Sequence, residues 1–165
     1  MVETASRETV DAEKFRDVMG SVPTAVAVIT AVDQEPVGVA VGSFVSISLR
    51  PPMVGFFMDF ASETWPRLEK AGSFTVNVLS DRQAHICRRF GQKDVDRFSG
   101  LDWSGGHEGS PRLAGALAWI ECDIERVEEI GDHLLVVGLV RSLDEGDADG
   151  GGPLLFLRRG YRSVR

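Results

Sequence analysis

Few side chains in this sequence have the types and the spacing that catalysis requires. Ser80, Asp81 and His85 lie close together, but no GxSxG elbow surrounds the serine, and such an elbow is what exposes a hydrolase nucleophile. The run from Ser80 to Gln83 instead has the form of a helix capping box, which explains Ser80 better than a catalytic triad does. His85 and Cys87 lack a second pair at zinc-like spacing. The sequence therefore predicts neither a hydrolase nor a zinc enzyme.

The other candidate ligands are acidic. Asp144, Asp147 and Asp149 have the composition of a calcium loop but not its spacing, so a solvated hairpin tip is the preferred interpretation and no metal site is predicted. The dinucleotide fingerprint GxGxxG is absent, so any use of a nicotinamide cofactor would not be of the Rossmann type. The residues taken alone lead no further than an antiparallel β-barrel, with ligand binding left open.

Length and charge restrict the choice further. The chain has 165 residues, of which 43% are hydrophobic and 26% charged, with a formal net charge of −7, and these values fit one globular domain. The charge argues against a nucleic-acid or anionic-membrane partner, and an anionic cofactor would need local donors. Cys87 and Cys122 form no CxxC pair, which favours free thiols. No apolar N-terminal segment or membrane-length apolar run is present, so we expect a cytoplasmic location.

Any site must be positioned by a mainly β scaffold. We expect residues 1–10 to be disordered and residues 11–165 to form one domain. Caps and glycine stops predict helices over 11–19, 64–71 and 80–90. Apolar and β-branched segments predict strands over 24–32, 37–49, 53–59, 73–79, 118–125, 134–143 and 153–157. Gly38 and Gly42 fall inside the second strand and indicate a bulge or a close approach to the backbone. Residues 93–112 are predicted to be irregular.

This pattern of strands and short helices predicts one antiparallel barrel with helices at its ends. The segment 53–59 is almost wholly apolar. Met53, Val54, Phe56 and Phe57 present more apolar surface than one small domain readily covers. We therefore expect a second subunit to cover part of it.

A set of motifs, in order from about Met19 to Tyr161, resembles the flavin reductase family. They are VPTAVAVIT at 22–30, VGVAVGSFVSISLRPP at 37–52, AGSFTVNVLS at 71–80, QAHICRRF at 83–90, DRF at 96–98, GALA at 115–118, GDH at 131–133 and GY at 160–161. Each motif is weak alone, but the ordered set is specific and covers nearly the whole chain.

The resemblance implies an antiparallel split β-barrel of the Greek-key, FMN-binding type with a few short flanking helices. It implies a homodimer with the flavin near the subunit interface, and reduction of FMN or FAD by NADH or NADPH. Reduced flavin would pass to a partner flavin-dependent monooxygenase. The residues that the resemblance assigns to cofactor binding are Thr24, Ala40, Val41, Gly42, Ser43, Phe44, Ser46, Ser62, Asn77, Phe90, His133 and Tyr161.

His133 is the residue to which the resemblance assigns catalysis. Hydride transfer needs the nicotinamide stacked on the flavin and the developing negative charge stabilised, and a histidine can supply a hydrogen bond or a positive charge there. The alternative is a surface histidine in a hairpin turn. For Thr24 and Asn77 the alternative is strand pairing, and for Phe90 it is core packing.

The sequence departs from the family pattern at Ala25, where glycine is more usual, at Gly42, where serine is common, and at Arg50, where an acidic residue is frequent. The first two departures put flavin affinity in question more than the fold. Two competing functions remain: a non-catalytic flavin-binding or carrier protein on the same fold, and a split-barrel oxidase of pyridoxamine-like substrates. The oxidase is disfavoured because the motifs belong to the reductases.

Overall fold

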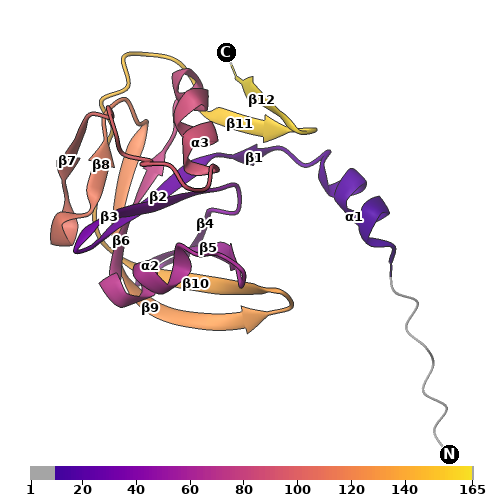
Figure 1. Ribbon diagram of the computed structural model, residues 1–165, viewed down its shortest axis with the longest axis horizontal. Helices are drawn as coiled ribbons and strands as arrows, with labels where there is room; N and C mark the ends of the chain where they lie inside the picture. Colours follow the sequence, from indigo (N-terminus) through magenta and orange to yellow (C-terminus); the bar gives the residue numbers. More distant parts are fainter. Residues whose placement is uncertain (1–9, 165) are drawn as a thin grey trace, which may run out of the picture.

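The computed structural model describes residues 10–164, and Figure 1 shows its elements. Residues 1–9 of the segment predicted to be disordered lie outside that range. The helices are α1 (Ala12–Met19), α2 (Trp65–Ala71) and α3 (Ala84–Phe90). The strands are β1 (Thr24–Ala25), β2 (Ala27–Asp33), β3 (Glu35–Val41), β4 (Val45–Leu49), β5 (Pro52–Asp59), β6 (Ser73–Val78), β7 (Trp103–Gly105), β8 (Pro111–Leu113), β9 (Ala118–Ile130), β10 (His133–Glu145), β11 (Leu154–Leu157) and β12 (Gly160–Ser163).

The main sheet has seven antiparallel strands in the order β3-β2-β6-β9-β10-β5-β4. Its two edge strands, β3 and β4, follow each other in the chain and are joined only by Gly42–Phe44. A flat sheet with six strand gaps of about 4.8 Å would be roughly 29 Å wide, whereas four Cα–Cα steps of about 3.8 Å reach at most ~15 Å. The sheet must therefore curl into an open barrel, which confirms the predicted mainly β split barrel.

The predicted strand over 37–49 is wrong in one respect. The chain leaves the sheet at Gly42 and re-enters it on the opposite edge at Val45, so one predicted strand is two. The sequence does not reveal this strand break, because residues 37–49 have the composition of one continuous strand. The predicted strand over 24–32 is likewise divided into β1 and β2, and the structure adds β12. β1 and β12 pair with β11 in a second sheet of three strands.

The three predicted helices are confirmed, together with the polar contacts that bound them. Asp11 accepts a hydrogen bond from the Lys14 backbone N–H at 2.9 Å and begins α1. Gly72 ends α2 with a left-handed φ of 71°. The Gln83 side chain accepts a hydrogen bond from the Ser80 N–H at 3.0 Å, in the single turn that precedes α3.

Two hydrophobic clusters fill the barrel. The larger cluster includes Phe56 and Phe74, whose rings meet edge to face at 5.2 Å, and α2 covers it with Trp65 and Leu68. The smaller cluster lies under α3 and includes Phe90. A Cβ at Gly38 would lie 2.7 Å from the Phe90 ring, so this strand glycine allows α3 to pack closely on β3.

The exposed apolar surface is only partly where the sequence placed it, since Phe57 is 37% exposed. Val54 and Phe56 are buried within the subunit, because they face the barrel interior. Further exposed apolar side chains lie on α1 and on the edge strand β4. They are Phe15, Val18, Met19, Val45, Ile47 and Leu49. Helix α1 buries none of its residues and projects from the barrel (Figure 1). Within residues 10–164 no helix is long and apolar enough to cross a membrane.

Candidate active site

A cavity of about 560 Å³ opens at the end of the barrel where β1, β3, α3 and the β11–β12 hairpin meet. Its volume lies in the range of small-molecule and cofactor sites. Five residues that the sequence assigned to cofactor binding line it together. The lining residues are Thr24, Val26, Ala40, Val41, Gly42, Cys87, Arg88, Gly91, Gln92, Phe156 and Tyr161.

Gly42 leaves room at the edge of this cavity. A Cβ at this position would lie 2.9 Å from the Thr24 Oγ1, closer than such atoms approach without a shift. The glycine therefore lets the Thr24 side chain lie against the backbone after β3, and both residues border the cavity.

The wall opposite Gly42 is aromatic and neutral. The Tyr161 hydroxyl donates a hydrogen bond to the Cys87 Sγ at 3.3 Å. Burial raises the pKa of Tyr161 to about 12, and burial also raises the pKa of the Cys87 thiol. Both groups are therefore uncharged at neutral pH. The Arg88 guanidinium carbon lies 5.0 Å from the centre of the Tyr161 ring, which is the distance of a cation–π contact.

The loop that joins the sheet edges continues from the cavity, but its side chains face the barrel. The Ser43 Oγ accepts a hydrogen bond from the Phe57 N–H at 2.9 Å. Phe44 packs against the larger cluster, and Ser46 pairs with Val54 on β5. The Ser43 hydroxyl thus fixes the loop against β5.

Asn77 and Phe90 have the contacts of structural residues. Asn77 is fully buried. Its amide nitrogen donates to the carbonyls of Val28 and Pro111, at 3.1 and 3.3 Å, and its Oδ1 accepts from the Leu113 N–H at 2.7 Å. Phe90 is 1% exposed and packs edge to face on Phe98 at 5.1 Å. Neither side chain lines the cavity.

His133 and Ser62 lie on neighbouring turns, and neither residue lines the cavity. His133 begins β10 and pairs with Asp59, and the turn after β5 then brings the Ser62 N–H to the Asp59 carbonyl at 3.0 Å. The imidazole is 42% exposed, and its Nδ1 lies 2.7 Å from the Asp132 Oδ1. This hydrogen bond orients the ring and lowers the pKa of Asp132.

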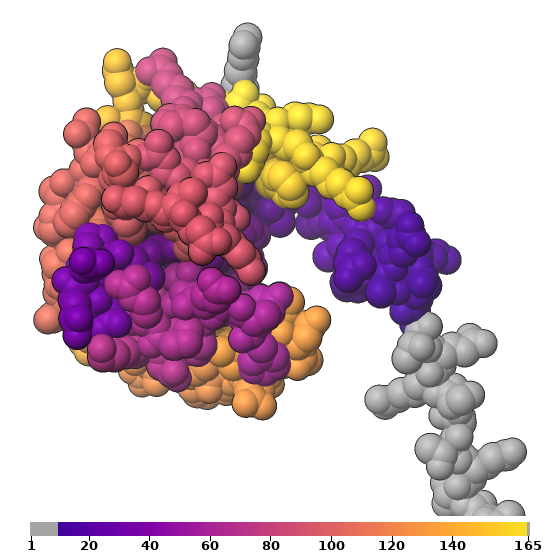
Figure 2. Space-filling view, in the orientation of Figure 1, coloured from indigo at the N-terminus to yellow at the C-terminus, as the bar shows by residue number. Residues whose placement is uncertain are grey.

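The positive charge of Arg16 on α1 also acts on the turn that carries Asp132. Arg16 contributes to the lowered pKa of Asp132, after the larger contribution of His133. Figure 2 shows a deep notch between α1, in indigo, and the part of the barrel that carries the magenta and orange segments. His133 is therefore on an open surface that a second molecule can approach, whereas Tyr161 forms part of the cavity wall.

Sequence reasoning missed the contribution of α3. Cys87, Arg88, Gly91 and Gln92 line the cavity from one side of the helix end. Their spacing of one, four and five positions places them on one helical face, and that spacing was the signal available. Phe156, also missed, stacks edge to face on Tyr161 at 5.6 Å.

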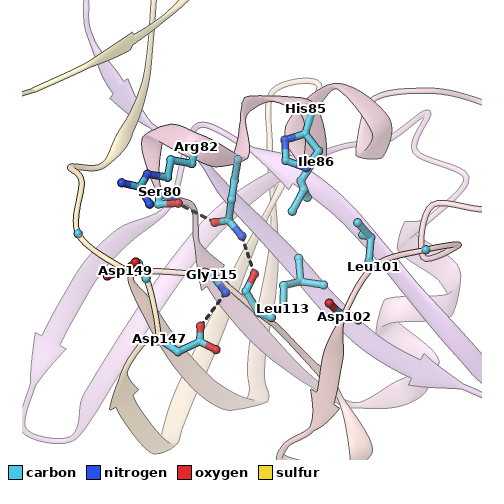
Figure 3. Close-up of a pocket in the computed structure, with 15 residues that line it drawn as sticks. Ser80, Arg82, His85, Ile86, Leu101, Asp102, Leu113, Gly115, Asp147 and Asp149 are labelled. Carbon is cyan, nitrogen blue, oxygen red and sulfur yellow. Dashed lines mark hydrogen bonds between the residues drawn. The ribbon is translucent and has the colours of Figure 1, made fainter.

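Of the residues first weighed for hydrolase or metal chemistry, Ser80, His85, Asp147 and Asp149 line a different cavity of about 410 Å³ (Figure 3). Gln83 spans its wall, because its Nε2 donates to the Ala114 carbonyl at 2.8 Å. Asp147 accepts a hydrogen bond from the Gly115 N–H at 2.6 Å. Among residues 10–164 no group of three or more His, Cys, Asp and Glu side chains could hold a metal ion. Asp147 here fixes a turn.

Residues 19–165 match the family model described as the flavin reductase like domain. A flavin reductase of Pseudomonas putida is 48% identical over 157 residues, which cover 94% of this chain and 91% of that protein. The solved structure of nitrilotriacetate monooxygenase component B from Mycobacterium thermoresistibile is 40% identical, with a TM-score of 0.89, covering 93% of this chain and 86% of the other. The NADH:FAD oxidoreductase SgcE6 of Streptomyces globisporus, solved with NAD and FAD fragments, is 35% identical with a TM-score of 0.87, covering 96% and 97%.

Proposed function

The chain belongs to the flavin reductase family, an NAD(P)H:flavin oxidoreductase family, and we propose that it reduces FMN or FAD in the cavity between Gly42 and Tyr161. The supporting observation is that cavity, which is lined together by five of the residues that the family resemblance assigns to cofactor binding. The non-catalytic carrier is not favoured, because the relatives are named as reductases.

The residues present fit a flavin. The apolar wall of Ala40, Val41 and Tyr161 suits the face of a ring system, and the Thr24 hydroxyl offers a hydrogen bond. The bound flavin supplies the ring atom that accepts a hydride from the nicotinamide. Because Cys87 and Tyr161 stay neutral at neutral pH, the wall adds no negative charge that would oppose reduction of the ring.

We assign the orientation of the nicotinamide to His133. Its imidazole is exposed and Asp132 holds its Nδ1, so the other ring nitrogen is free to bond a ligand. A donor positioned there would stabilise the negative charge that reduction places on a bound flavin. Ser43, Phe44, Ser46 and Ser62 support the loop and the turn that border the ligand. Asn77 and Phe90 support the strands and helix behind them.

We also propose that the protein is a homodimer. Helix α1 buries none of its side chains, and Phe15 on it is 58% exposed. The edge strand β4 presents Ile47 and Leu49 to solvent. A second copy is the partner that would cover such apolar faces in a small protein. Light scattering at micromolar concentration should give twice the chain mass, and a monomer would contradict the proposal.

Reduced flavin from this reaction would serve a flavin-dependent monooxygenase. Relatives are named as reductase subunits of such enzymes, and the released reduced flavin is what the second component consumes. We place the reaction in the cytoplasm. Both cysteines, Cys87 and Cys122, are free thiols, as expected in a reducing compartment.

The direct test is anaerobic mixing of the purified protein with FMN or FAD and NADH or NADPH. The visible absorbance of the flavin should bleach with at least one pair. Folded protein that bleaches neither flavin with either nicotinamide would contradict the enzyme and leave the carrier.

A further inference from the structure

Another cavity, of about 540 Å³, lies between α1 and the turn that joins β11 to β12. Figure 2 shows α1, in indigo, against the yellow C-terminal hairpin. We call this cavity the arginine pocket, because Arg16, Arg158 and Arg159 line it. It adjoins the cavity proposed for the flavin, since Thr24 and Phe156 line both. The reaction described above gives the arginine pocket no role.

The arginine pocket has an excess of positive charge. Its three guanidinium groups are opposed by one carboxylate, that of Asp17. Within residues 10–164 the side chains of Arg16 and Arg158 make no salt bridge or hydrogen bond, and the Nη2 of Arg159 lies 3.8 Å from the Asp17 Oδ1. In a chain with a net charge of −7, these arginines leave N–H donors for an anionic ligand, and guanidinium groups match phosphate oxygens well.

The turn that carries two of these arginines is unfavourable for the residues that form it. Leu157 pairs with Gly160, so Arg158 and Arg159 are the two central residues, and both have a left-handed φ, of 47° and 61°. Asparagine and glycine adopt such a turn at the least cost in free energy, whereas arginine does not. The Arg158 N–H holds the turn against α1 by donating to the Gly20 carbonyl at 2.8 Å. Two arginines at positions that folding alone would give to other residues indicate a role for their side chains.

The arginine pocket also borders the region to which we assign the hydride donor. Arg16 projects from α1, and its charge acts on Asp132, the residue that orients His133. A dinucleotide with its nicotinamide beside His133 can therefore extend its other half toward α1. Phe156 is 40% exposed and offers an aromatic surface to a purine base.

We propose that the arginine pocket binds the adenylate half of the nicotinamide dinucleotide, and that it thereby favours NADPH over NADH. This inference rests on the proposed function. NADPH carries a further phosphate on its adenosine ribose, and in the arginine pocket that phosphate meets more guanidinium groups than carboxylates. FAD contains an adenylate half as well, so the experiment must separate the hydride donor from the flavin.

The test gives the turn the residues that it favours. The double variant Arg158→Asn with Arg159→Gly removes both guanidinium groups and creates the preferred Asn-Gly turn, so its melting temperature should stay the same or rise. Reduction of FMN is then measured with NADPH, NADH and reduced nicotinamide mononucleotide, which lacks the adenylate half. KM should rise about tenfold or more for NADPH and by a smaller factor for NADH. For the mononucleotide KM should change less than about twofold, and kcat should be nearly unchanged throughout, because uniform binding is lost.

Arg162→Gln is the matched control, because Arg162 is an exposed arginine of the same hairpin that does not line the arginine pocket. Arg16→Gln should raise the KM for NADPH although it leaves the turn intact. Binding is also measured without turnover, by calorimetric titration of adenosine diphosphate into protein saturated with FMN. Wild-type affinity should fall as ionic strength rises, and the double variant should lose most of that dependence.

Equal rises in KM for NADH and the mononucleotide would overturn the proposal, because the turn would then act on the nicotinamide site and not on the adenylate half. Unchanged KM values in both Arg16→Gln and the double variant would also overturn it. A weakened affinity for FAD, with FMN affinity and both dinucleotide KM values unchanged, would assign the arginine pocket to the flavin, which overturns the inference and leaves the reductase intact. Wild-type protein that reduces neither flavin with any donor would overturn this inference together with the proposed function.

Discussion

The two sides of the barrel treat charged side chains in opposite ways. On the side covered by β7 and β8, charged side chains pair with one another around the buried carboxylate of Glu121. Glu121 is 2% exposed and receives the Arg112 Nε and Nη2 at 2.9 and 2.7 Å, together with the His107 N–H at 2.7 Å. Asp123 beside it bonds the His107 ring at 2.7 Å and the Arg141 Nε at 2.6 Å. Both carboxylates of this network thus accept hydrogen bonds from cationic side chains of the same chain.

On the cavity side the donors are left open. The Arg88 guanidinium has only an aromatic face as its neighbour, and the Thr24 hydroxyl borders the space that Gly42 leaves. A glycine also appears in the paired network, since a Cβ at Gly106 would overlap the Glu121 carboxylate. At both glycines a side chain of the same chain takes up this room, Glu121 at Gly106 and Thr24 at Gly42. The difference lies in the charged donors: Arg112 meets a carboxylate in the paired network, whereas Arg88 borders an open cavity.

The largest expected effect is a loss of folding stability when the Arg112–Glu121 pair is broken. Glu121→Ala leaves Arg112 without its buried partner, and breaking a buried ion pair costs about 3–5 kcal/mol of the free energy of unfolding. For a chain of this size the melting temperature should fall by roughly 10 °C. Glu129→Ala, on the same strand but exposed, is the control and should change little. A loss below about 1 kcal/mol in Glu121→Ala would show that the network does not stabilise the fold.

The next effect is on the rate of reduction. His133→Asn removes the donor that we place at the nicotinamide, and loss of one transition-state hydrogen bond costs about 2–3 kcal/mol, or roughly 30- to 150-fold. Single-turnover reduction of bound flavin by NADH measures this rate, while flavin affinity should stay nearly unchanged. His85→Asn is the matched control, because His85 lines the other cavity. If His133→Asn shows wild-type rates at both limiting and saturating NADH, His133 is a surface residue of the hairpin turn and has no part in the reaction.

Gly42→Ala tests the open side by steric means. The added Cβ would lie 2.9 Å from the Thr24 Oγ1, and overpacking of this kind costs about 1–3 kcal/mol. FMN and riboflavin binding should both weaken, by roughly 5- to 150-fold, in protein that still folds. Gly105→Ala is the control, because its Cβ would find no heavy atom closer than 3.8 Å. Equal flavin affinities in the two variants would place the ring elsewhere.

The fold was largely predictable where local signals are strong. Caps at Asp11 and Ser80 and stops at Gly20 and Gly72 gave the helices. The division at Gly42 was not predictable from periodicity, because a glycine in a strand is compatible with a bulge, a close approach or a strand end. The structure shows that Gly42 marks a strand end, because β3 pairs with β2 whereas β4 pairs with β5.

The site was predictable in part, for a related reason. The resemblance assigned Thr24, Gly42 and Tyr161, which the structure places around one cavity. Glu121 occupied a position that alternation predicts to be exposed, and it is buried because Arg112 approaches from a segment without periodicity. Arg88 was missed because adjacent arginines on a helix usually indicate a solvated face. Whether a charged residue is structural or functional depends on the residues that contact it from distant parts of the chain. The local sequence does not identify those residues.

The smallest effect is the response of the two sides to acid. Hydrogen bonds from Arg112 and His107 lower the pKa values of Glu121 and Asp123 from their ordinary 4.5 and 3.8. A carboxyl with a lowered folded-state pKa contributes stability that is present above its ordinary value and is lost as the pH falls toward the folded value. The free energy of unfolding, measured by urea titration, should therefore be flat near neutral pH and decline below about pH 4.5.

The control for this last prediction is Asp123→Asn, which should start less stable and decline less steeply with acid, because one of the two linked carboxyls is gone. The cavity has no acidic lining residue, so riboflavin affinity should hold constant over the range in which the protein stays folded. If acid weakened riboflavin binding before it lowered the stability, a carboxylate would have to belong to the flavin site, and the separation between the two sides of the barrel would fail.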